Sequence, residues 1–398
     1  MKLITETSEL TACCARLAQA PYITVDTEFL REKTFWPKLC LVQIAGPEDE
    51  LIIDPLAPGM DLSPLYDLMA NTGVLKVFHA ARQDVEIFHH DGGVIPKPMF
   101  DTQVAAMVCG FGDSVGYDTL ARKISKVHID KSSRFSDWSV RPLSERQLKY
   151  AMQDVTHLRG IYEWLARELH KNRREAWLSE EMATLTDPGT YVTDPREAWL
   201  RIKTRGGNRR FLGVLREITA WRETEAQARD LPRSRVIRDE ALLEIAAHPP
   251  HTLAEMGKMR SVTSGFADGK LGASLLAAIR LGVEMPEADL PPLPERDTDS
   301  PSTGGTVELL KVLLKIKCEQ DGVASKLVAS SADLERIAAR DEADVPAMHG
   351  WRREIFGQAA LDLKHGRLAI AMKGNKIILA PLPNESLRQP VTLLIKKK

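Results

Sequence analysis

The sequence predicts an α/β plus all-α protein, in which a mixed-sheet domain is followed by two small helical domains. Apolar, β-branched runs with the length of strands alternate with amphipathic helical spacing in the N-terminal part of the chain. After residue 205 the apolar spacing is helical. A Pro-rich, acidic stretch at 286–305 contains few core-forming residues and separates the two helical parts.

The chain has 398 residues, which is enough for two or three domains with cores of their own. The following boundaries are predicted: mixed-sheet domain 1–185, connecting segment 186–205, helical domain 206–285, linker 286–305, second helical domain 306–385 and basic tail 386–398.

Composition bounds the location and the partners. The chain is 43% hydrophobic and 27% charged, with a net charge of −1, and no apolar run reaches the roughly 20 residues of a membrane span. The N-terminus MKLITETSEL carries acids where a signal peptide needs basic and apolar residues. The five cysteines show no CxxC spacing, as in a reducing compartment. We therefore expect a cytoplasmic protein without membrane contact. A net charge near zero argues against a protein that coats nucleic acid along its whole surface, but it permits a local basic surface.

The elements of the first domain follow from periodicity in chain order. Three β-branched runs separated by short turns predict an antiparallel meander, and a strand between two helices then predicts a βαβ-like unit. The sheet should therefore be mixed and covered by helices. The expected elements are helix 6–19, strands 22–29, 39–45 and 50–55, helix 62–71, strand 75–80 and helix 81–91.

The strand YITVDTEF carries two acids, Asp26 and Glu28, which must project from the same side because side chains alternate along a strand. Like charges this close require protonation of one group or a bound cation. Asp84 and Asp154 lie in similar surroundings, and carboxylate oxygens without thiols favour Mg²⁺ or Mn²⁺. The alternative is that Asp26 ends a strand and Glu28 is solvated.

A long helix is predicted from the capping pair Ser144 and Gln147 onward. Tyr150 and Asp154 are four residues apart and therefore share one flank of this helix. Such a tyrosine is, by itself, most often a packing residue with a hydrogen bond. Its interest comes from the acids that precede it in the chain. The helix buries a stripe made of Leu148, Ala151, Val155, Leu158 and Tyr162.

Other polar and aromatic residues near these segments have two readings each. His79 ends a strand and is either a ligand or a hydrogen-bonded rim residue. Phe29 either stacks on a terminal base or fills the core behind its strand. His89 and His90, with Asp91, could form a metal motif, but they precede two glycines, which favours a solvated helix C-terminus. Asp101 is expected to cap a helix or, alternatively, to contact a residue of the acidic site.

Three motifs, VDTEF, HAARQD and YAMQD, with SDWSVRPL just upstream of the last, occur in this order over about 130 residues. They resemble the exonuclease motifs of the DEDD superfamily of 3′-to-5′ exonucleases, and in particular the ribonuclease D family. The resemblance implies a ribonuclease H-like fold for residues 1–185. It also implies the tyrosine branch of the superfamily, because Lys149 stands where the other branch has histidine.

By the same resemblance, Asp26, Glu28, Asp84 and Asp154 hold two divalent ions, Mg²⁺ or Mn²⁺, and Tyr150 orients the attacking water. Asp26 would bridge the ions, Glu28 and Asp154 would complete the first site, and Asp84 would hold the second. The implied reaction is hydrolysis of RNA from its single-stranded 3′ end with release of nucleoside 5′-monophosphates. The implied substrates are precursors of tRNA and other stable RNAs, and the expected state is a monomer.

The helical part is locally basic: eleven Lys or Arg stand against four acids between Arg201 and Arg238. A basic stripe of this kind indicates contact with phosphates, unless it is a solvated helical face. Arg209 and Arg210 are the candidate substrate contacts here. The segment LREITAWRETEAQARDLPRSRV resembles an HRDC domain, and the helices after residue 306 resemble a diverged second copy. Together the two modules would narrow the path of RNA to the exonuclease domain.

Two other functions remain open from the residues. The same chemistry could act on DNA, because the choice of sugar depends on contacts to the 2′-OH that a sequence does not place. A non-catalytic RNA-binding scaffold is disfavoured by the presence of all four acids and the tyrosine.

Overall fold

The computed structural model describes residues 2–134, 136–204, 206–293 and 304–382. These residues divide into two compact units. The first takes its described residues from the segments Met1–Phe100, Ile129–Arg159 and Ala183–Glu295, and the second from Asp101–His128, Gly160–Met182 and Arg296–Lys398. No helix of the described residues is long and apolar enough to span a bilayer.

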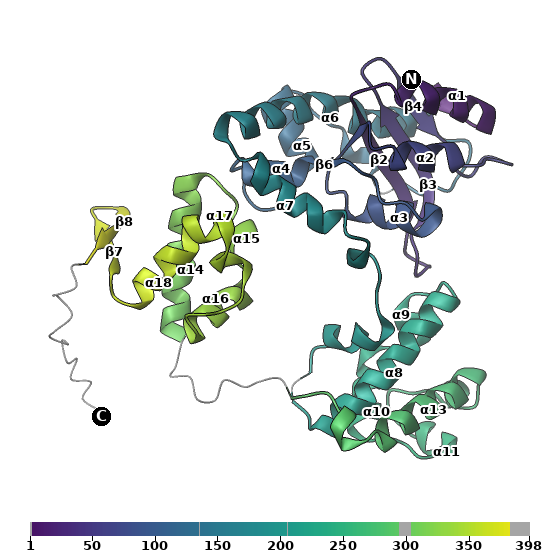
Figure 1. Ribbon diagram of the computed structural model, residues 1–398. Helices are drawn as coiled ribbons and strands as arrows, with labels where there is room; N and C mark the ends of the chain where they lie inside the picture. Colours follow the sequence, from purple (N-terminus) through teal and green to yellow (C-terminus); the bar gives the residue numbers. More distant parts are fainter. Residues whose placement is uncertain (1, 135, 205, 294–303, 383–398) are drawn as a thin grey trace. The chain divides into compact units, whose positions relative to one another are not determined.

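A six-stranded mixed sheet carries the first domain (Figure 1). Its strands, in the spatial order β1-β4-β3-β2-β5-β6, are β1 (Lys2–Ile4), β4 (Glu50–Ile53), β3 (Lys38–Ala45), β2 (Tyr22–Leu30), β5 (Leu75–Phe78) and β6 (Met99–Asp101). The pairs β2–β3 and β3–β4 are antiparallel, which confirms the predicted meander, and β2–β5 and β1–β4 are parallel. The short strand β1 was not predicted, since three residues show no periodicity.

The helices along residues 7–185 begin and end where local signals place them. Asp101 accepts hydrogen bonds from the backbone N–H groups of Gln103 and Val104 and so caps α4, and Gly93 in the left-handed conformation ends α3. Ser144 and Gln147 form the predicted capping pair at the start of α6. The helices are α1 (Thr7–Leu17), α2 (Ser63–Ala70), α3 (Arg82–Gly92), α4 (Thr102–Val108), α5 (Tyr117–Leu120), η1 (Ala121–Ser125), η2 (Lys131–Ser133), α6 (Glu145–Asn172) and α7 (Glu175–Leu185).

The first half of α6 packs on the sheet and brings a distant part of the sequence to β2. The hydroxyl of Thr24 donates to the carbonyl oxygen of Val155 at 2.8 Å, which joins β2 directly to the helix. Around this contact is a core of apolar residues from β3, β4 and α6, together with Trp138: Cys40, Leu41, Ala45, Ile52, Ala151, Met152 and Val155. Asp154, next to Val155, is thereby held close to β2.

The basic segment folds as a helical domain with its own core. Leu215 and Ile218 are fully buried, and Phe211 and Trp221 pack against them, as their spacing predicted. Its elements are η4 (Pro195–Arg201), α8 (Arg209–Ala228), α9 (Arg233–Val236), α10 (Asp239–Ala247), α11 (Leu253–Met256), α12 (Ser264–Ala267), α13 (Lys270–Glu284) and η5 (Glu287–Asp289). The preceding η3 (Pro188–Thr190) contacts the first domain, where Arg82 donates to the carbonyl oxygen of Thr190. Leu290 is buried, so the first residues of the predicted linker pack on this domain. The remainder, 294–303, lies outside the described residues.

The second helical part has a β-hairpin that the sequence analysis missed. We expected only helices over 306–385, but β7 (Leu368–Lys373) and β8 (Lys376–Pro381) pair antiparallel. The two-residue turn between them contains Gly374 at φ +59°, which is the turn chemistry of hairpins. The helical elements are α14 (Gly304–Asp321), α15 (Ser325–Val328), α16 (Ser331–Ala339), η6 (Pro346–Met348), α17 (Gly350–Arg352), η7 (Arg353–Gly357) and α18 (Gln358–Lys364). The expected basic tail, 386–398, lies outside the described residues.

Candidate active site

Three carboxylates from two distant segments meet at the face of the sheet that α6 covers. Asp26 and Glu28 come from β2 and Asp154 comes from α6. One oxygen of each lies within 4.8 Å of the others. The two strand acids therefore point to one side, as alternation predicted. A register shift follows directly after Glu28 in the pairing with β3, so the strand changes course just beyond the acids.

The surroundings of these acids favour their neutral forms unless a cation is present. Burial, and then the charge of Asp154, raise the pKa of the Asp26 carboxyl well above its ordinary range. Burial raises the pKa of Glu28 to about 10, with further contributions from Asp26, Asp154 and Asp84. Arg134 acts in the opposite direction on Glu28. Positive charge in the middle of the group would relieve the repulsion.

Tyr150 lies one turn before Asp154 on α6 and forms a side-chain hydrogen bond with it. Burial, and then the negative charges of Asp154, Glu28 and Asp26, raise the pKa of this phenol further above its ordinary value. Tyr150 is therefore a neutral hydrogen-bonding group at physiological pH. Its ring lies 6.1 Å from the ring of buried Trp138, which limits its movement.

Asp84, in the first turn of α3, is close to the three carboxylates without being one of them. Its side chain is buried, and it accepts a hydrogen bond of 2.5 Å from the hydroxyl of Thr27. Its charge contributes to the raised pKa of Glu28. The structure thus groups three of the four predicted acids tightly and places the fourth beside Glu28.

The donors present fit a hard divalent cation. Oxygens within 4.8 Å of one another can share one ion at the usual ligand distances of about 2.0–2.6 Å. A second observation is the side chain of Gln43, which is fully buried on β3 directly opposite Asp26. Neither its oxygen nor its nitrogen has a hydrogen-bond partner among the described residues. A buried amide without partners is costly, and a hydrated ion beside Asp26 would supply them.

The two other candidate residues near the acids are partly buried. Phe29 follows the register shift and pairs with Leu39, and His79 comes directly after β5. Substrate contact by these two residues stays a prediction.

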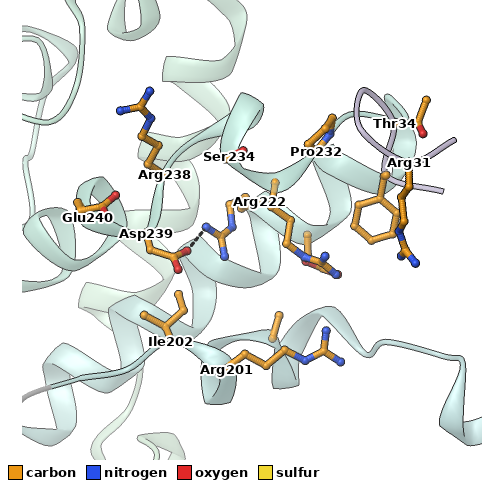
Figure 2. A pocket seen from close by; sticks show the side chains of 14 residues that line it. Arg31, Thr34, Arg201, Ile202, Arg222, Pro232, Ser234, Arg238, Asp239 and Glu240 are labelled. Carbon is orange, nitrogen blue, oxygen red and sulfur yellow. Dashed lines mark hydrogen bonds and ion pairs between the residues drawn. The ribbon is translucent and has the colours of Figure 1, made fainter. Parts of the chain in front are cut away.

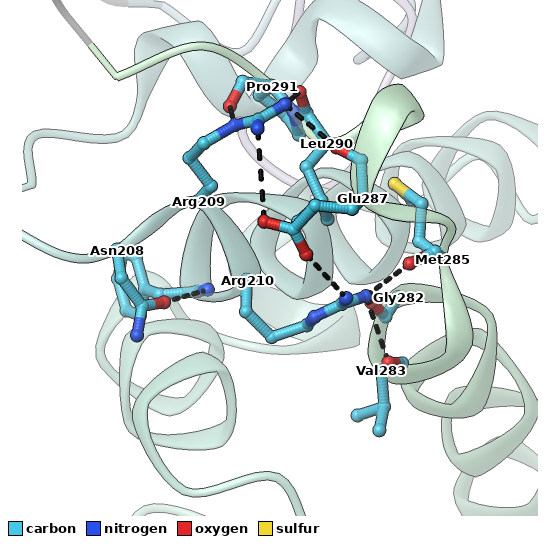
Figure 3. A network of polar contacts seen from close by, with 10 residues as sticks. Asn208, Arg209, Arg210, Gly282, Val283, Met285, Glu287, Leu290 and Pro291 are labelled. Atoms are coloured by element: carbon cyan, nitrogen blue, oxygen red, sulfur yellow. Dashed lines mark hydrogen bonds and ion pairs between the residues drawn. The ribbon is translucent and has the colours of Figure 1, made fainter.

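Arg209 and Arg210, at the start of α8, are engaged within the helical domain, as Figure 3 shows. Arg209 donates to the carbonyl oxygens of Glu287 (2.9 Å) and Leu290 (2.8 Å). Arg210 donates to the carbonyl oxygens at the end of α13, including that of Val283 at 3.0 Å. These contacts give both arginines a structural role, because they fasten the end of α13 and the residues after it to α8. That they also bind substrate stays a prediction without support from the geometry.

Sequence reasoning missed Gln43, Thr27 and Arg134. A signal existed for Gln43, because it is a polar residue inside the otherwise apolar run LCLVQIA. For Thr27 and Arg134 no local pattern exists, since their importance follows from contacts with Asp84 and Glu28 across the fold.

Family models match the mixed-sheet domain and the first helical domain. A 3′-5′ exonuclease model matches residues 1–170, and an HRDC domain model matches residues 211–279.

Similar proteins cover almost the whole chain. The chain is 55% identical to a ribonuclease D from Granulibacter bethesdensis over 95% of this chain and 96% of that protein. It is 52% identical to one from Nitrobacter hamburgensis, over 95% and 99% respectively. Among solved structures, the crystal structure of Escherichia coli RNase D, described as an exoribonuclease involved in structured RNA processing, matches with a TM-score of 0.80 and 30% identity. That match covers 92% of this chain and 98% of the other.

Proposed function

The chain belongs to the ribonuclease D family and is a 3′-to-5′ exoribonuclease, and we propose that it trims the 3′ ends of stable RNA precursors such as tRNA. The products would be nucleoside 5′-monophosphates. The work of the E. coli protein on structured RNA supports this choice of substrate. The cytoplasmic location and the monomeric state expected from the sequence remain predictions.

We propose that Asp26, Glu28 and Asp154 hold one divalent ion and that Asp84 contributes to a second. The close spacing of the three carboxylates and the raised pKa values of Asp26 and Glu28 support the first site. The charge of Asp84 beside Glu28 supports the second. Bound Mg²⁺ or Mn²⁺ would lower the pKa of the attacking water and stabilise the leaving oxygen. In such a site the carboxylates are ionised, since the cation replaces the protons that burial would otherwise keep on them.

Tyr150 is proposed to position the attacking water. Its phenol stays protonated at neutral pH, so it acts by hydrogen bonding and does not remove the proton. Asp154 fixes the direction of the phenol through the hydrogen bond between the two side chains. Tyr150 and Asp154 are one helix turn apart on α6, so the helix keeps the distance between the phenol and the carboxylate constant.

The observation that carries this proposal is the meeting of Asp26, Glu28 and Asp154, which are far apart in the chain, beside one phenol. The test offers 5′-labelled RNA with a free or a blocked 3′ end, with Mg²⁺ or with chelator, to the wild type and to Asp26→Asn. Stepwise shortening should need a free 3′ end, the metal and Asp26. Asp268→Asn is the matched control, because Asp268 is exposed and belongs to the helical domain.

Two results would contradict the proposal. Shortening that persists in chelator or in Asp26→Asn would remove the role of the acids. Equal shortening of a DNA strand of the same sequence would contradict the assignment to RNA.

A further inference from the structure

The first unit contains a cavity of about 820 Å³ that the acidic site does not use (Figure 2). Five of its 14 lining residues are arginines, which come from separate segments of the chain: the residue after β2, η4, α8, α9 and the residue before α10. We call this cavity the arginine pocket, after Arg31, Arg201, Arg222, Arg233 and Arg238. Three acids also line it, so positive charge is in excess.

The wall that follows β2 is fixed to the helical domain by hydrogen bonds. The carboxylate of Asp230 accepts from the backbone N–H groups of Phe35 (3.0 Å) and Trp36 (2.9 Å). The guanidinium of Arg233 lies 4.6 Å from the centre of the Phe35 ring. These contacts hold the segment after β2 against α8 and α9.

Two of the arginines form the framework of the pocket. Arg233 makes a bidentate pair with Glu223, whose side chain is fully buried. Arg222, whose side chain is only 5% exposed, donates to Asp239 from one terminal nitrogen at 2.5 Å. Figure 2 shows the Arg222–Asp239 contact. Two of the three lining acids are therefore already neutralised by arginine.

Arg201 and Arg238 differ from these two because no acid among the described residues pairs with them. The side chain of Arg201 has a single long hydrogen bond of 3.4 Å to Thr193, and that of Arg238 has none to the described residues. Both residues are exposed. The third lining acid, Glu240, lies in the first turn of α10, where it complements the helix dipole. Two guanidinium groups are thus available to an anion.

Arg222 supplies a further sign of a missing acceptor. Its Nε is buried and has no hydrogen-bond partner among the described residues. A buried N–H group without an acceptor destabilises a fold, and charged donors more than neutral ones. An anionic oxygen in the pocket would satisfy this donor.

The pocket lies near the acidic site, so the anion could be part of the RNA substrate. Arg31 follows Glu28 by only three residues, which is about 10 Å at the rise of a strand. Arg31 itself is paired with Glu86 of α3 at 2.7 Å and keeps the rim of the pocket beside the exonuclease sheet. An RNA strand whose 3′ end lies at the acids and that runs toward Arg31 would pass this pocket, and arginine binds phosphate oxygens in a bidentate manner.

We propose that the arginine pocket binds backbone phosphates of the RNA, a few nucleotides upstream of the bond that is cut. Arg201 and Arg238, which Figure 2 shows on different sides of the pocket, contact phosphate oxygens of the strand, the Nε of Arg222 donates to one of these oxygens, and the Arg233–Glu223 pair shapes the pocket. This inference rests on the proposed function, because it requires an RNA 3′ end at the acidic site.

The test is the Arg201→Gln/Arg238→Gln double variant of the full-length chain, since both side chains are exposed and their loss should leave the fold intact. Steady-state KM with Mg²⁺ is measured for RNAs of about 12 and about 3 nucleotides. We expect KM for the longer RNA to rise about tenfold, and the salt dependence of log KM to fall by about one unit per arginine. The shorter RNA ends before the pocket, so its KM should rise far less. Arg280→Gln, an exposed arginine of α13 outside the pocket, is the matched control and should change neither KM.

The outcomes separate this inference from the proposed function. If the wild type shortens RNA but the double variant has an unchanged KM for the longer RNA, or the same loss for both lengths, only the pocket assignment fails. If the wild type shortens no RNA, the proposed function fails. Thermal stabilisation of the wild type by ATP that the double variant loses, with RNA kinetics unchanged, would assign the pocket to a free nucleotide and overturn the RNA assignment.

Discussion

The acidic site and the arginine pocket are both connected to strand β2, and they handle charge in opposite ways. At the acidic site, three carboxylates lie within 4.8 Å of one another, and burial, followed by the charges of the neighbouring acids, raises the pKa values of Asp26 and Glu28. In the arginine pocket, the buried charges of Glu223 and Arg222 each have a partner. A site that binds a cation holds like charges close together, which lowers the stability of the folded state without the cation. In the arginine pocket, by contrast, oppositely charged side chains pair with one another and hold the lining in place.

The largest expected effect tests the acidic half of this comparison. Asp154→Asn removes a carboxylate oxygen from the proposed ion site and weakens the orientation of Tyr150. Losing several kcal/mol of transition-state stabilisation corresponds to a fall in kcat of about 10³-fold. In chelator the same change should raise the melting temperature, because it removes repulsion. Both are measured on one preparation by RNA shortening and thermal unfolding; a melting temperature that falls in chelator would contradict the reading of the site.

The opposite result is expected for a carboxylate of the pocket. Glu223→Gln removes a fully buried carboxylate and leaves the guanidinium of Arg233 without its bidentate partner. We expect a loss of about 2–3 kcal/mol in unfolding free energy, less than for a fully buried pair because Arg233 is partly exposed. Denaturant unfolding measures it, with Glu225→Gln as the control, since Glu225 pairs with Arg229 nearer the surface. If both substitutions lowered the unfolding free energy equally, the Glu223–Arg233 pair would have no special role in the pocket.

The pH dependence of stability should sharpen the comparison further. Without metal, folded Glu28 keeps a proton up to about pH 10, whereas the unfolded chain releases it near pH 4.5. The folded state therefore binds more protons in this window, and its stability should fall as pH rises through it. Mg²⁺ should offset the fall, and more so at higher pH, because it binds the ionised ligands. Melting temperatures between pH 5.5 and 8.5, with and without Mg²⁺, check this, and Glu28→Gln should flatten the metal-free profile.

The smallest expected effect concerns Gln43, the buried amide opposite Asp26. Gln43→Met replaces a polar group that has no partner among the described residues by an apolar one of similar size. In chelator we expect a gain of about 1 kcal/mol in unfolding free energy, because the cost of the orphaned amide is removed. With Mg²⁺ the gain should shrink, since hydrated metal supplies partners to the amide of the wild type. Identical gains in both conditions would mean that Gln43 is unrelated to the metal.

Much of the first domain could be predicted because its signals are local. The meander, the capping of α4 by Asp101 and the shared side of Asp26 and Glu28 all follow from periodicity or from residues within a few positions of each other. The hairpin β7–β8 was missed although its turn signal is also local, because the helical resemblance of the preceding residues was extended over it. Arg209 and Arg210 were candidate substrate contacts because of their charge, and the structure shows them donating to carbonyl oxygens 73–81 residues away.

The residues and their spacing were enough to predict the candidate site: an acid pair on one face of a strand, a post-strand acid, and a tyrosine one helix turn before another acid. Which of these charges are compensated depends on the fold, because pairing requires side chains that are distant in the chain to come within a few ångströms of one another. The fold left the carboxylates of β2 and α6 facing one another, paired Arg222 and Arg233, and left Arg201 and Arg238 without acidic partners among the described residues. Local periodicity fixes the direction of a side chain along its own element, and it carries no information about the charge that the fold places opposite.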